Sequence, residues 1–63
     1  MKVGDIVKVK IREGAHHHHD TRWWGLVGVI IAEAKRIHVP SFKVLLGGEI
    51  IEFDYDELEL VAQ

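Results

Sequence analysis

Alternation of apolar and polar residues is the main structural signal in this chain, and it begins near the N-terminus. Residues 5–12 read DIVKVKIR, so one side of an extended chain carries Val7, Val9 and Ile11, and the other carries Lys8, Lys10 and Arg12. A period of two is typical of a strand with one buried face. The pattern predicts a half-buried first strand, preceded by a turn at Gly4 and Asp5.

A second, longer strand is expected over residues 24–33. This segment is rich in β-branched and aromatic residues, which favour strands. Gly25 and Gly28 inside it indicate a bend or a bulge, as a tightly curved sheet requires. The polar residues 13–22 between the first two strands predict a long loop, and long loops often carry function.

Three short strands are expected in the second half of the chain, over residues 41–46, 49–53 and 58–61. Pro40 is compatible with the start of the first of these strands. The dipeptide Gly47-Gly48 predicts a two-residue hairpin turn. The sequence DYDE at residues 54–57 predicts a single turn of 3₁₀ type.

Five short strands with glycine turns predict an all-β chain that forms a small closed or nearly closed barrel, because closure removes exposed sheet edges. Residues 1–63 are then one domain with a histidine-rich loop at about residues 13–22. The inward positions predict a core of Val7, Val9, Ile11, Val27, Val29, Ile31, Val44, Leu46, Ile51, Phe53, Leu58 and Leu60.

The chain has 63 residues and no cysteine. A domain of this size has a marginal core, so a metal or self-association is the expected source of extra stability. The absence of cysteine fits a reducing compartment, and no signal peptide is recognisable, so we expect a cytoplasmic protein. The longest apolar run, at residues 23–32, is shorter than the roughly 18 residues that cross a bilayer, so no membrane contact is expected.

The formal net charge is −2, which does not favour a protein that seeks phosphate groups. The charge is unevenly distributed. Residues 1–38 carry seven basic and four acidic side chains, a net of +3, and residues 39–63 carry one basic and six acidic side chains, a net of −5. The two halves either form two charged faces or neutralise each other across strands.

The sequence VGDIVKVKIREG, followed by GLVGVI, resembles the KOW element of NusG-type transcription factors and of some ribosomal proteins. The tail KVLLGGEIIEFDYDELELV is similar to the closing hairpin, 3₁₀ turn and last strand of SH3-like barrels. The resemblance implies a five-stranded SH3-like barrel that binds RNA, a transcription complex, peptides or another copy of itself. The chain length also resembles that of small proteins of tailed phages.

A nucleic-acid surface is one hypothesis that follows from this resemblance. Its residues would be Lys8, Lys10, Arg12 and Arg22 on phosphates, with Trp23 and its neighbour Trp24 stacking on unpaired bases. RNA-binding members of the family usually carry a basic first loop, whereas this chain has EGAHHHHD there. In a barrel of this kind the first strand lies beside the last, so we favour cross-strand pairing of the lysines with Glu59 and Glu57.

The histidine run at His16 to His19 is a candidate metal site. Imidazole binds zinc, nickel and copper, and alternate histidines of an extended chain point to the same side. The proposed ligands are His16, His18, His19 and Asp20. We favour a solvent-exposed loop, natural or tag-like, that binds zinc or nickel adventitiously, so no cofactor is expected. The same loop would gain charge on mild acidification, which predicts a pH-responsive element as a further alternative.

The second strand is apolar on both sides. If Val27, Val29 and Ile31 face the core, then Trp24, Leu26 and Ile30 face outward, and Leu45 and Ile50 also lie outside their core registers. An exposed apolar patch commonly marks an interface, and tryptophan is a favoured anchor. The alternatives are that bulges rotate these residues inward or that the histidine loop folds over them. The predicted interface comprises Trp23, Trp24, Leu26, Ile30, Leu45 and Ile50.

The chain has one serine and one threonine, and neither lies in a recognisable catalytic motif. A barrel this small also has little room for a substrate pocket. We therefore expect a non-catalytic interaction module that forms a homo-oligomer or binds another protein. Nucleic-acid binding is the second hypothesis, and a metal- or pH-responsive loop is the third.

Overall fold

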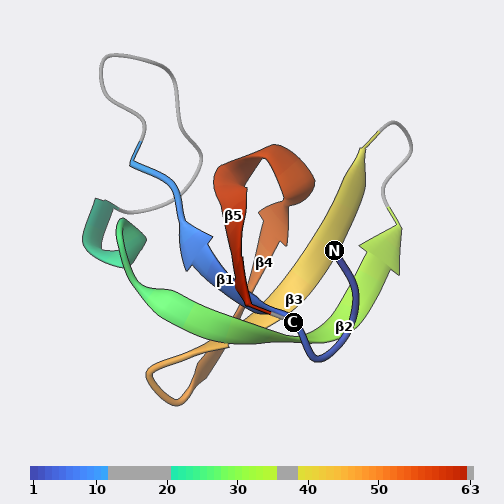
Figure 1. The fold of residues 1–63 in the computed structure, drawn as a ribbon, viewed down its shortest axis with the longest axis horizontal. Helices are drawn as coiled ribbons and strands as arrows, with labels where there is room; N and C mark the ends of the chain where they lie inside the picture. Colours follow the sequence, from blue (N-terminus) through green and yellow to red (C-terminus); the bar gives the residue numbers. More distant parts are fainter. Residues whose placement is uncertain (12–20, 36–38, 63) are drawn as a thin grey trace.

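The described residues form one sheet of five antiparallel strands, with two single 3₁₀ turns outside it (Figure 1). The computed structural model describes residues 1–11, 21–35 and 39–62. The elements are β1 (Ile6–Val9), η1 (Thr21–Trp23), β2 (Val27–Lys35), β3 (Pro40–Leu46), β4 (Glu49–Asp54), η2 (Tyr55–Glu57) and β5 (Leu58–Ala62). The predicted all-β class, the 3₁₀ turn and the five strands are confirmed.

The strand order is β4-β3-β2-β1-β5, so the first strand pairs with the last as expected. Within the described residues, hydrogen bonding does not join β4 to β5, and these two strands are the edges of the sheet. The sheet is strongly bent, and Figure 1 shows β2 as its longest and most visibly curved strand. No helix in the described part of the chain could span a membrane.

A bulge lies in the middle of β2. Ile30 pairs with Val44 of β3, but the next pair is Ala32 with Lys43, so Ile31 is the extra residue. A bulge of this kind bends the strand and increases its twist. It also changes which residues of β2 face inward on either side of Ile31. The prediction of a bend or bulge in this strand is confirmed, three residues after Gly28.

The core lies on the concave face of the sheet, which we call the inner face. It comprises Val7, Val9, Trp23, Ile30, Phe42, Val44, Leu46, Phe53 and Leu58, with Trp24 and Ile51 packed against it. The predicted core is confirmed for both valines of β1, for the predicted residues of β3 and β4, and for Leu58 of β5. It is wrong for Ile11, Val27, Ile31 and Leu60, which are exposed.

The error in β2 has a steric cause. Gly28 lies on the inner face opposite Val7, and a Cβ there would approach the Leu45 carbonyl oxygen and lie 2.7 Å from Leu46 Cδ2. Only glycine fits that position. Ile30, two residues later, shares the inner face and is 1% exposed. Val27 and Val29 therefore point outward, opposite to the prediction.

The turn that precedes β1 is hydrogen-bonded to β2. Gly4 has φ +97°, and the Asp5 N–H donates to the Lys2 carbonyl oxygen at 3.1 Å, which closes a four-residue turn. The buried Asp5 carboxylate accepts the Lys2 N–H at 2.9 Å. Ile30 N–H in turn donates to the Asp5 carbonyl oxygen at 3.0 Å. The Gly-Asp pair is thus a structural part of the fold.

Candidate functional site

The outer face of the sheet carries one continuous apolar row. Residues of neighbouring strands that stand opposite each other on this face are Ile50 of β4, Leu45 of β3, Val29 of β2, Ile6 of β1 and Ala62 of β5. We call these five residues the outer apolar row. Ile50 is 58% exposed and Leu45 is 39% exposed, whereas Val29 and Ile6 are half-buried. The row crosses every strand of the sheet.

Charged pairs flank this row on both sides. Two residues along from Leu45 and Ile50, Lys43 of β3 stands opposite Glu52 of β4. On the other side of the row, Lys8 of β1 stands opposite Glu59 of β5. An apolar centre with a charged rim is the usual organisation of a protein–protein interface. The outer face is therefore the candidate interaction surface.

The structure places the predicted interface residues in two different environments. Leu45 and Ile50 lie together in the outer apolar row, and Leu26, which directly precedes β2, is exposed but outside the row. The predicted exposure of Ile30 and Trp23 is wrong, because both side chains belong to the core. Trp24 is partly buried against the same core, as the alternative of inward rotation anticipated.

The apolar side chains that β2 carries on the outer face, where Ile30 was expected, are exposed or half-buried. They are Val27, Val29 and Ile31. Sequence reasoning assigned them to the core because both sides of this strand are equally apolar. The signal that separates the two sides is Gly28, since a glycine between β-branched residues indicates close backbone approach on its own side.

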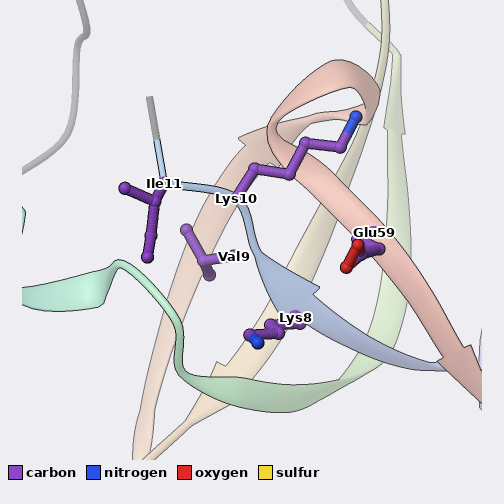
Figure 2. Close-up of a pocket in the computed structure, with 5 residues that line it drawn as sticks. All are labelled: Lys8, Val9, Lys10, Ile11 and Glu59. Atoms are coloured by element: carbon purple, nitrogen blue, oxygen red, sulfur yellow. The ribbon is translucent and has the colours of Figure 1, made fainter. Parts of the chain in front are cut away.

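Of the favoured pairing between lysines and glutamates, the structure shows the strand register at Lys8 and a backbone contact at Lys10. Lys8 is in register with Glu59, and the Lys10 N–H donates to the Glu57 carbonyl oxygen at 2.9 Å. An open pocket of about 270 Å³ lies here, lined by Lys8, Val9, Lys10, Ile11 and Glu59. Figure 2 shows the side chains of Lys8, in β1, and of Lys10, just after β1, extending in different directions. Arg12 lies outside the described residues.

Trp23 is poorly placed for stacking on a base. Its side chain is buried in the core, and the Arg22 guanidinium carbon lies 4.7 Å from the centre of its ring. A cation over an aromatic face at this distance is a favourable contact. The face that Arg22 covers is not open to another planar group, so the predicted base contact of Trp23 has no support from its surroundings.

The predicted metal ligands His16, His18, His19 and Asp20 lie outside the described residues. Within the ranges that the structure does describe, no three or more His, Cys, Asp or Glu side chains gather in a way that could hold a metal ion. The metal- or pH-responsive loop stays a prediction. Calorimetry with zinc and nickel on a chain without terminal tags would test it.

No protein family model, curated protein or solved structure matches this chain. The resemblance to KOW elements stays a prediction that rests on the motif residues quoted above. Function is inferred below from the chemistry of the outer face and of the lysine pocket.

Proposed function

We propose that this protein is a non-catalytic interaction module that self-associates through the outer apolar row. The observation that supports the proposal is the row itself, in which Ile50, Leu45 and Val29 stand side by side and a charged pair lies on each flank. A monomer keeps these side chains in water. A second copy laid over the row would remove them from water and leave the charged pairs at the rim.

Burial energetics favour this arrangement. Complete burial of one aliphatic side chain contributes about 1.5–3 kcal/mol, and Ile50 and Leu45 are both more than a third exposed. Association also adds to the free energy of unfolding by mass action, because only the folded chain presents the row. That gain matters most for a small chain, and nine of its described residues form the buried core.

Sedimentation over a concentration series tests the proposal. A range from about 10 μM to about 1 mM covers weak and moderate interfaces. We expect the weight-average mass to rise with concentration. Ile50→Lys should lower the association constant at least about tenfold, because it places a charge among the apolar side chains of the contact.

Ile11→Lys is the matched control for this variant. Ile11 is 60% exposed, close to the 58% of Ile50, and it lies beside the lysine pocket and not in the outer apolar row. The control should associate like the original chain. A strict monomer across the whole range, or equal weakening by both substitutions, would contradict self-association through the row.

The lysine pocket supports a second candidate, an anionic partner such as single-stranded RNA. Lys8 and Lys10 are both exposed and line one open pocket with the apolar Ile11. A gel shift at low and at moderate salt tests it, since phosphate contacts weaken steeply as salt rises. Binding should decrease in Lys8→Gln and Lys10→Gln, and the absence of any shift at low salt would remove this candidate.

A further inference from the structure

The two halves of the outer apolar row differ in how much apolar surface they offer. On the β3–β4 side, Ile50 is 58% exposed and stands opposite Leu45, which is 39% exposed. On the β1–β5 side, the corresponding pair is Ile6, which is half-buried, and the small Ala62. A strongly bent sheet presents only part of its convex face to the equally convex face of a second copy. The β3–β4 hairpin is thus the part with most to gain from being covered.

The charges on this hairpin are arranged for a reciprocal contact. Lys43 and Glu52 stand opposite each other, on the same two strands as Leu45 and Ile50 and two residues away. A two-fold axis that runs between β3 and β4, parallel to them, exchanges the positions of the two strands. In the resulting pair of stacked sheets, each lysine faces a glutamate and each isoleucine faces a leucine. Such self-complementarity is what a two-fold interface requires.

The geometry points to a two-fold homodimer centred on the outer face of the β3–β4 hairpin. This inference rests on the proposed function. Ile50 packs over the partner's Leu45, and Lys43 faces the partner's Glu52, with each contact made twice. Sheets stacked face to face lie about 10 Å apart, which side chains of these lengths span. The second charged pair, Lys8 with Glu59, lies outside the contact.

Charge exchange between two variants tests this geometry. Lys43→Glu creates two glutamate–glutamate contacts in a homodimer, and Glu52→Lys creates two lysine–lysine contacts. Because like charges then oppose each other twice in the contact, each variant alone should dimerise roughly tenfold more weakly than the original chain. An equimolar mixture restores two opposite-charge contacts. Sedimentation or native mass spectrometry should then detect the heterodimer in preference to either homodimer.

Two control experiments test whether an effect arises from altered folding, or from any charge change on the outer face, instead of from the proposed contact. The double variant Lys43→Glu/Glu52→Lys again places opposite charges across each hairpin and between the two chains, so it should dimerise within about threefold of the original affinity. The mixture of Lys8→Glu with Glu59→Lys is the matched control on the other flank. It should show no preference for the heterodimer.

The outcomes distinguish this inference from the proposed function. If the original chain is monomeric, both are wrong. If it dimerises and Ile50→Lys disrupts the dimer, but mixing the hairpin variants restores nothing, the row is an interface and the two-fold axis lies elsewhere. Preference for the heterodimer in the mixture of Lys8 and Glu59 variants would place the axis between β1 and β5 and overturn the inference.

Discussion

At the scale of single residues, glycine is required in this chain for two unrelated reasons. Gly28 lies in a strand on the inner face, where a side chain would collide with Leu45 and Leu46. Gly48 has open space around it but a φ of +87°, which side chains disfavour. The first glycine is a matter of packing, and the second is a matter of backbone conformation.

Gly28→Ala should lower the free energy of unfolding by about 1–3 kcal/mol, the usual effect of adding a methyl group to a filled core. The added Cβ would lie 2.7 Å from Leu46 Cδ2 and 2.9 Å from Val44 Cγ1, so β3 must shift. Urea denaturation measures the change. Val27→Thr, an isosteric change at a 54% exposed neighbour, should stay within about 0.5 kcal/mol. Equal effects would contradict the assigned faces of β2.

Asp5→Ala should destabilise the fold by about 1–3 kcal/mol. The buried carboxylate accepts the Lys2 N–H at 2.9 Å, and its removal leaves that donor without this partner. Asp5→Asn keeps an acceptor oxygen in place and should lose less. Thermal unfolding of both variants gives the comparison. A loss in Asp5→Asn as large as in Asp5→Ala would show that the charge, and not the acceptor, matters.

At the scale of elements, the β3–β4 hairpin is the part most fully specified by its own sequence. Gly47 and Gly48 have φ values of +51° and +87°, which fit the two central positions of a type I′ turn. This turn fixes the register from Leu46 with Glu49 to Ser41 with Asp54. The same register places Lys43 beside Glu52, so the turn also determines the charge pattern of the outer face.

Substitutions in this turn should separate its two positions. Gly47→Asn should change the free energy of unfolding by less than about 0.5 kcal/mol, because asparagine is favoured at the first position of a type I′ turn. Gly48→Ala should destabilise by about 1–2 kcal/mol through the backbone alone, since no atom lies within 4 Å of the added Cβ. Urea midpoints compare the two. A neutral Gly48→Ala would exclude the type I′ geometry.

The element that sequence reasoning placed wrongly is β2. Its two sides are equally apolar, so a period of two cannot tell which side faces the core. The bulge at Ile31 then changes the alternation partway along the strand. The predicted core of β1 was correct at Val7 and Val9 because the opposite side of that strand carries lysines. The buried face of a strand could be predicted where one face was apolar and the other was charged, and could not be predicted where both faces were apolar.

At the scale of the whole molecule, the sheet offers two ways to associate. One is stacking over the outer apolar row, and the other is strand addition at the open edges of β4 and β5. Unpaired edges are common sites of such addition. The acidic residues near these edges, Glu49, Glu57 and Glu59, would repel their counterparts in a second copy. Stacking buries apolar side chains without that repulsion.

Hydrogen exchange should distinguish these two modes. The amides of β1 and β3, and those of residues 27–29 in β2, lie between two paired strands and should exchange slowest. The outward amides of β4 and β5 should exchange fast at low and high protein concentration alike, because face stacking leaves strand edges unpaired. Nuclear magnetic resonance at two concentrations measures this. Concentration-dependent protection of the edge amides would instead support strand addition.

The sequence by itself determined the all-β class, the number of strands, the glycine hairpin and the 3₁₀ turn, because these depend on local periodicity and turn chemistry. The register of Lys8 with Glu59 was expected from the resemblance to small barrels, in which the first strand lies beside the last. It also identified Leu45 and Ile50 as outward residues. Only the tertiary structure decided the face of β2, the burial of Ile30 and Trp23, and the assembly of five separate residues into the outer apolar row. These depend on close approach between strands that are distant in sequence. Because β3 leaves no room for a side chain at Gly28, that side of β2 faces the core and the neighbouring valines face outward.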